Sequence, residues 1–146
     1  WKPSADALIF ANYSTGFKSG GFNSGGGLPA LGQRRIFANE TVKNYELGAK
    51  TTWLDGSLVF NATAFRMDIA GFQDRAFDGL SFIVRNAGNL RQQGLELDAV
   101  LRPSRNFSFN AALAYLDSKF TDYRTAAGLP GLGGTQDITG TPNAFS

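Results

Sequence analysis

The sequence predicts an all-β protein: an antiparallel meander of about five long strands that forms a segment of a larger transmembrane β-barrel. Three observations carry this prediction. Apolar and polar residues alternate along five segments, a two-strand unit repeats after about 50 residues, and short turns alternate with long connections. The repeat is visible where residues 60–68 match residues 109–117, and where residues 46–49 match residues 96–99.

The strands expected from the alternation are, in order, residues 5–16, 41–54, 57–72, 89–102 and 107–123. Each has one apolar face and an opposite face of small, amide or charged residues. In the second strand Leu47 is apolar, whereas Glu46 and Lys50 lie on the opposite face. In the fourth strand the charged residues are Glu96 and Asp98. These four charged residues are therefore expected to face the lumen of a barrel whose apolar face meets outer-membrane lipid.

Aromatic residues flank the apolar face at both ends of the expected strands. Trp53 and Phe107 lie beside the short turns, whereas Tyr13, Tyr45 and Tyr115 lie towards the long connections. Aromatic girdles on either side of an apolar band are typical of barrels that cross an outer membrane. These aromatic residues therefore support a sheet whose apolar face contacts lipid.

The connections alternate in length, as they do in bacterial outer-membrane barrels. The turns at residues 54–57 and 103–106 are short, and the long connections, rich in Gly and Ser, are residues 17–40, 73–88 and 124–146. A closed barrel needs about eight strands or more. Five strands do not suffice, so the whole chain is expected to be a fragment of a barrel domain.

Composition excludes several classes of function. The chain has no Cys and no His, which removes disulfide scaffolds, thiol or imidazole metal sites and triads that use His as base. A net charge of +2 is too small to indicate a nucleic-acid partner. An enzyme is not expected and no cofactor is predicted, because catalysis would depend on carboxylates such as Asp68 and Asp117. The repeat explains those two more simply as strand-end residues.

Several short motifs follow one another along the chain. They are residues 13–23, residues 40–50, Phe65 with Asp68 and Gln73, Asn86-Ala87-Gly88 with Gly94-Leu95-Glu96-Leu97 and Pro103, and Asp137-Ile138-Thr139-Gly140. In this order they resemble the β-barrel portion of the TonB-dependent receptors of the Gram-negative outer membrane. The Pro-containing strand that usually follows the last motif is missing. Each motif is short, and their order over nearly the whole chain makes the resemblance specific.

The resemblance implies a barrel of about 22 strands that is plugged by an N-terminal domain. Such a receptor sits in the outer membrane and actively imports a scarce ligand, such as an iron–siderophore complex, with energy from the TonB complex. The plug and the TonB-contacting segment precede the barrel, so both are expected outside this chain. The alternatives are a passive porin-type barrel and a soluble β-sandwich. A β-sandwich would have apolar residues on the inner faces of its strands, where this sequence has charged residues.

Candidate ligand-binding residues lie in the long connections: Arg34, Arg35 and Phe77. The two cations would attract an anionic complex and the ring would stack on an aromatic ligand; a solvated loop charge and a lipid-headgroup anchor are the alternatives. The four lumen-facing charges fit a hydrated ion-pair lattice, with a ligand or metal site as the alternative. The Gly-rich residues 16–27 lack the Gly-Lys-Ser/Thr ending of a phosphate cradle.

Overall fold

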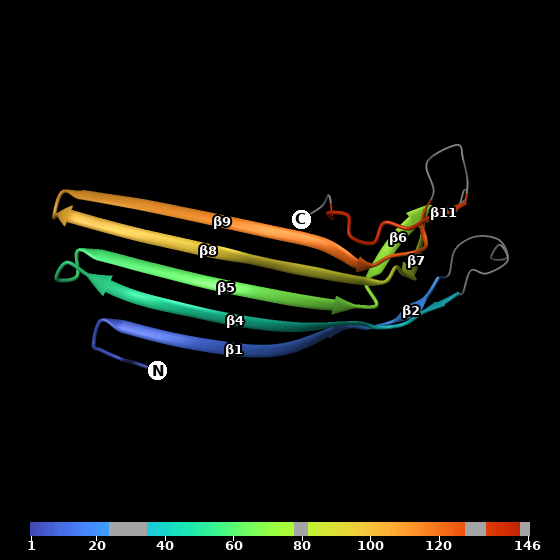
Figure 1. Cartoon of the computed structure of the whole chain (residues 1–146), viewed down its shortest axis with the longest axis horizontal. Helices are drawn as coiled ribbons and strands as arrows, with labels where there is room; N and C mark the ends of the chain where they lie inside the picture. The colour runs from blue at the N-terminus through green and yellow to red at the C-terminus, as the bar shows by residue number, and fades with distance from the viewer. Residues whose placement is uncertain (24–34, 78–81, 128–133, 144–146) are drawn as a thin grey trace. The chain divides into compact units, whose positions relative to one another are not determined.

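The computed structural model describes residues 1–23, 35–77, 82–127 and 134–143, and the regular elements among them are β-strands. The long strands are β1 (Ala7–Lys18), β4 (Glu40–Trp53), β5 (Leu58–Ala70), β8 (Asn89–Ser104) and β9 (Phe107–Asp122). They form one five-stranded sheet in the order β1-β4-β5-β8-β9 (Figure 1). The predicted antiparallel meander is confirmed, with strand bounds close to the expected ones. The described residues contain no helix that is long and apolar enough to cross a membrane.

Short hairpins occupy parts of the segments that the sequence suggests are long connections. The antiparallel pairs are β2 (Gly21–Phe22) with β3 (Ile36–Phe37), β6 (Gln73–Phe77) with β7 (Phe82–Asn86), and β10 (Ala126–Ala127) with β11 (Thr135–Gln136). The two-residue strands β2, β3, β10 and β11 are too short for a period-two pattern, and the five-residue strands β6 and β7 do not alternate between apolar and polar residues. The alternation therefore predicts the long strands and not these hairpins.

The chain divides into two compact units, which we describe separately. The turn-end unit comprises residues 1–14, 44–67 and 92–117 and contains the short turns. The loop-end unit comprises residues 15–43, 68–91 and 118–146 and contains the short hairpins.

In the turn-end unit, an Asp-Gly pair turns the chain between β4 and β5. Asp55 and Gly56 have φ angles of 53° and 89°, and Ser57 N donates to Leu54 O at 3.0 Å. Positive φ at both central residues is the requirement of a type I′ turn, whose twist matches that of two antiparallel strands. This turn explains how residues 54–57 reverse the chain within so short a distance.

A further turn, which the sequence analysis does not anticipate, precedes β1. Trp1 and Ile9 exchange two backbone hydrogen bonds, each of 2.9 Å. The first residues therefore pair with β1 as an antiparallel strand does. The signal in the sequence is Pro3-Ser4, which matches Pro103-Ser104 at the end of β8.

The buried apolar residues among those described lie in the loop-end unit: Ile69, Ala87, Leu90, Phe120, Tyr123 and Ala126. The ring of Phe120 lies 6.1 Å from that of Phe72 and 5.1 Å from that of Tyr123, measured between centroids. The chain then returns along β9, where Gly140 N donates to Phe120 O at 2.7 Å and Asn143 N donates to Ser118 O at 2.9 Å. This small core fixes the hairpins to the ends of the long strands.

Candidate ligand-facing site in the loop-end unit

A buried glutamine joins separate segments of the loop-end unit. Gln73, at the start of β6, is 8% exposed, and its Nε2 donates to Ser19 O at 3.0 Å and to Ala38 O at 3.1 Å. Its backbone N donates to Glu40 Oε2 at 2.7 Å. Gln73 thus holds β6 against the chain on both sides of the β2–β3 hairpin.

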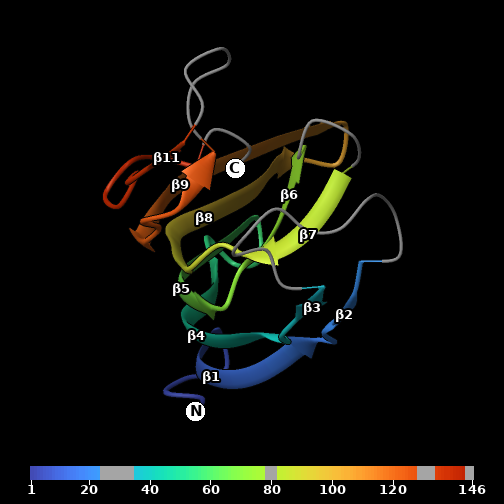
Figure 2. The ribbon, with the colours of Figure 1, turned by 90° about the vertical axis from the view of Figure 1, so that its right-hand side faces the viewer.

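Two asparagines make a similar connection. Asn86 Nδ2 donates to Gly71 O at 2.7 Å and to Ala38 O at 3.0 Å, and its Oδ1 accepts from Ala38 N at 2.6 Å. Asn23 donates to Val84 O and accepts from Val84 N, both at 2.8 Å. A side-chain amide that both donates and accepts replaces one step of a β-ladder. The two hairpins, drawn side by side in Figure 2, are thereby joined at β3 and β7 without forming one sheet.

Charged and aromatic residues gather around the β6–β7 hairpin. The Tyr123 hydroxyl donates to Asp74 Oδ2 and accepts from Arg85 Nη2 at 3.4 Å. The Arg75 guanidinium lies 5.7 Å from the centroid of the Phe82 ring, a cation–π distance. We call Asp74, Arg75, Phe82, Arg85 and Tyr123 the hairpin cluster. Within the described part of the chain, Arg85 Nε is buried without a hydrogen-bond partner.

Burial raises the pKa of Tyr123, and its hydrogen bond to Asp74 raises the pKa further. The nearby Arg85 acts in the opposite direction but does not reverse the shift. At neutral pH the phenol therefore stays protonated, and its O–H donates a hydrogen bond to the Asp74 carboxylate. The hairpin cluster then holds two cations against one carboxylate, which suits an anionic ligand.

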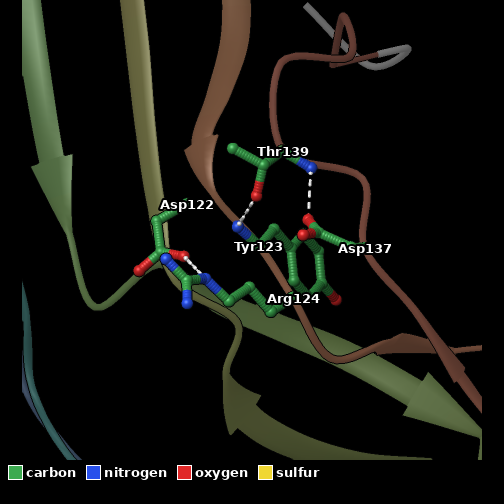
Figure 3. A network of polar contacts seen from close by, with 5 residues as sticks. All are labelled: Asp122, Tyr123, Arg124, Asp137 and Thr139. Carbon is green, nitrogen blue, oxygen red and sulfur yellow. Dashed lines mark hydrogen bonds and ion pairs between the residues drawn. The ribbon is translucent and has the colours of Figure 1, made fainter.

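Polar contacts also fix the chain after β9, as Figure 3 shows. Thr139 Oγ1 accepts from Tyr123 N at 2.9 Å, and Thr139 N donates to Asp137 Oδ1 at 2.9 Å. The hydrogen bonds from Thr139 lower the pKa of Asp137. Arg124 pairs with Asp122 at 3.2 Å. Tyr123 is therefore held through its backbone as well as its hydroxyl.

Two of the predicted ligand-binding residues, Arg35 and Phe77, fall on hairpins that the structure describes. Arg35 is exposed directly before β3, and its carbonyl accepts from Asn23 N at 2.8 Å. Phe77 is the last residue of β6 and pairs with Phe82. Arg34 lies outside the described residues. Their role in ligand binding stays a prediction, and the sequence analysis does not single out Asp74, Arg75, Arg85 or Tyr123.

In the turn-end unit, carboxylates on the predicted lumen-facing side accept hydrogen bonds from amides. Glu46 accepts from Asn12 at 3.3 Å, and Asp98 accepts from Asn61 at 2.7 Å. Lys50 and Glu96 are exposed. Nowhere in the described ranges do three or more His, Cys, Asp or Glu residues gather to hold a metal ion. This arrangement is that of a hydrated polar face.

Aromatic rings cover glycines on the same side of the turn-end unit. A Cβ at Gly48 would lie 2.3 Å from the Phe10 ring, and one at Gly94 would lie 2.8 Å from the Phe65 ring. The two phenylalanines therefore share a face with Glu46 and Asp98 and not with the apolar residues. A glycine inside an otherwise regular strand pattern is the sequence signal for such a close approach.

The sequence matches the family described as TonB dependent receptor-like, beta-barrel, over residues 1–145. The chain belongs to this family. The family is one of receptors in the outer membrane of Gram-negative bacteria. The fold is similar to that of the ferric yersiniabactin uptake receptor FyuA from Yersinia pestis, with a TM-score of 0.65 and 24% identity over 83% of this chain. The chain spans 17% of the length of FyuA.

The motifs typical of TonB-dependent receptors have structural roles in this chain. Asp68 pairs with Arg91 at 2.8 Å, and Gln73 and Asn86 join the hairpins as described above. Gly88 has a φ of 131°, and a Cβ there would lie 1.8 Å from Asp122 O. The motifs therefore mark how the receptor barrel anchors its hairpins, and they do not identify a ligand.

Proposed function

We propose that the chain is a section of the barrel wall of a TonB-dependent receptor that binds and actively imports a scarce ligand, such as an iron–siderophore complex. The match to the receptor barrel family over residues 1–145 carries this proposal. The sheet has β1 and β9 as its outermost long strands, and the chain spans a small part of the length of FyuA. Both observations support a barrel that is completed by further strands. On this proposal, the plug and the TonB contact belong to other parts of the receptor.

The two faces of the turn-end unit differ in polarity, which supports lipid on one side and water on the other. Leu47, Phe109 and Leu113 are 59%, 60% and 62% exposed, which suits a surface that meets lipid. Glu46, Lys50, Glu96 and Asp98 are proposed to line the lumen, where water and the hydrogen bonds from Asn12 and Asn61 solvate the carboxylates. Charged side chains that face the lumen stay hydrated, so the free-energy cost of burying a charge in hydrocarbon does not arise.

Arg34, Arg35 and Phe77 are proposed to contact the ligand, together with the hairpin cluster. In the loop-end unit, basic residues outnumber acidic ones. Arg85 is held in place by the buried Tyr123 and Arg75 by the Phe82 ring, so the two cations are preorganised to receive an anionic group. The ligand class suggested by these charges is an anionic chelate.

Siderophore uptake by a Gram-negative host tests the proposed import function. A strain without the receptor, complemented by the intact gene, is starved of iron and given a panel of radiolabelled ferric siderophores. Uptake of at least one siderophore should need both the receptor and TonB. Uptake that persists in cells lacking TonB would support the passive porin-type alternative instead.

Binding to cells tests the ligand-facing residues separately. The double variant Arg34→Ala with Arg35→Ala should raise the Kd for the transported complex severalfold, because two cations near the ligand are lost. The matched control, Arg102→Ala with Arg105→Ala, removes the same charge at the short turn and should leave the Kd unchanged. An unchanged Kd in both variants would remove Arg34 and Arg35 from the site.

A further inference from the structure

The indole of Trp53 makes its hydrogen bond within the sheet of the turn-end unit. Trp53 is the last residue of β4, and its Nε1 donates to Thr51 Oγ1 at 2.8 Å. The Thr51 hydroxyl donates in turn to Phe60 O on the neighbouring strand β5, also at 2.8 Å. An indole has one N–H donor and a hydroxyl has one O–H donor. Both donors are therefore used inside the protein, although Trp53 is 57% exposed.

The direction of this hydrogen bond differs from that of a tryptophan at a membrane interface. An interfacial tryptophan keeps its ring on the apolar side and directs its N–H towards water or lipid headgroups. Thr51 precedes Trp53 by two residues on β4, so it lies on the same face of the strand and farther from the turn at residues 54–57. The Trp53 N–H is therefore directed away from the turn and towards the middle of the strand.

The neighbours of Trp53 on this face are apolar. Leu58 lies opposite Trp53, because these two residues flank the turn that joins β4 to β5. Arg102 N donates to Ser57 O at 2.7 Å, so the adjacent residues of β8 and β5 also lie opposite each other. Those residues are Leu101 and Leu58. In such an apolar row an unpaired N–H would be costly to place in hydrocarbon, and the hydrogen bond within the sheet removes that cost.

We propose that Trp53 lies among the lipid acyl chains and not in the aromatic girdle at the headgroups, and that Thr51 is the positioning residue that permits this depth. The edge of the hydrocarbon then lies between Trp53 and the charged Asp55 of the turn. Acyl chains fit this surface better than headgroups, because headgroups would offer acceptors to an indole N–H that already has one. The proposal rests on the membrane-spanning part of the proposed function and is independent of ligand import.

Quenching of tryptophan fluorescence by brominated lipid measures the depth of the ring. The intact receptor is placed in phosphatidylcholine vesicles that carry bromine either near the middle of the acyl chains or near the headgroups. Subtracting the emission of the Trp53→Phe variant isolates the contribution of Trp53. Bromine in the middle of the chains should quench this contribution more strongly than bromine near the headgroups. The opposite order would overturn the proposal and place Trp53 in the girdle.

Two substitutions of Thr51 test its positioning role. Thr51→Val keeps the shape of the side chain but offers the indole no acceptor, so the Trp53 N–H should turn towards the headgroups. The population with a deep ring should then fall about fivefold relative to the population with a shallow ring, which is the ratio that a typical net hydrogen bond supports. Thr51→Ser keeps the hydroxyl and should give the quenching profile of the wild type. Equal profiles for Thr51→Val and Thr51→Ser would contradict the positioning role.

Insertion of each protein is read from circular dichroism and heat-dependent gel mobility. If Thr51→Val does not insert, Thr51→Ala takes its place, and the quenching profile of the wild type still decides the depth of Trp53. A wild type that does not insert contradicts the membrane-spanning proposal itself. A wild type that inserts with Trp53 at the headgroups contradicts only the deep position of this residue.

Discussion

Among the glycines that the structure describes, Gly88 has the closest backbone atom to an added Cβ. Its φ is 131°, and an added Cβ would lie 1.8 Å from Asp122 O. Gly88→Ala should therefore lower the free energy of unfolding by about 2 kcal/mol or more, because strain and steric overlap act together. Urea unfolding of the intact receptor in lipid vesicles measures the change.

Gly16→Ala is the matched control, since a Cβ at Gly16 would meet nothing within 4 Å. It should change the free energy of unfolding by about 0.5 kcal/mol or less. If both substitutions cost the same, the close approach of Gly88 to Asp122 is not what constrains this position.

Tyr123 gives the loop-end unit a dependence on pH. Its pKa is raised above 10.0 by burial and by the hydrogen bond to Asp74, so folding favours the protonated phenol. The resulting stabilisation is present in full below pH 10.0 and is lost as pH rises through the raised pKa. Unfolding of the wild type measured from neutral to strongly alkaline pH should show this loss, and Tyr123→Phe should lack that component. A phenolate absorbance difference between the two proteins that develops below pH 10.0 would contradict the shift.

The residues of the hairpin cluster also show why only part of the candidate site can be predicted from the sequence. Asp74, Arg85 and Tyr123 come from three places in the chain, and no spacing rule brings them together. Their contact depends on how β6 and β7 pack against the end of β9. Arg35 and Phe77 are recognisable as a cation and an aromatic residue in long connections, but the bonds that position a cluster are tertiary.

At the scale of one strand, β8 separates its two surroundings residue by residue. Leu97→Arg should cost about 2–4 kcal/mol of folding free energy in lipid if Leu97 lies near mid-membrane. The adjacent Glu96→Arg introduces the same side chain on the opposite face and should cost much less. Equilibrium unfolding in phospholipid vesicles compares the two variants. An intact receptor that tolerates both equally would show that the alternation does not correspond to lipid and lumen.

The long strands follow from the sequence because their alternation continues over many residues. β4 and β8 alternate apolar and polar side chains in their central parts, residues 44–50 and 94–99, and the Asp55-Gly56 turn fixes where the chain reverses. The short strands β2, β3, β6 and β7 give no such signal. They depend on contacts made by Gln73, Asn86 and Asn23, whose amides pair with backbone far away in the sequence.

For the whole chain, burial is distributed in a way that does not favour an independent soluble domain. The buried apolar residues of the described ranges belong to the loop-end unit. In the turn-end unit the large apolar side chains Tyr13, Leu47, Phe109 and Leu113 are exposed. A polar face and an exposed apolar face leave little hydrophobic burial to offset an ordering cost of about 1–2 kcal/mol per residue.

The isolated chain of 146 residues is therefore expected to aggregate in aqueous buffer or to require detergent. Its outermost long strands, β1 and β9, would offer edges for pairing with other chains, and its apolar face would associate with the same face of another copy. It should also show no specific binding of a siderophore. Size-exclusion chromatography with circular dichroism should give high-molecular-weight species without detergent and β-structure in smaller particles with it. A soluble monomer with a cooperative melt in detergent-free buffer would mean that the chain is a self-contained domain and not a section of barrel wall.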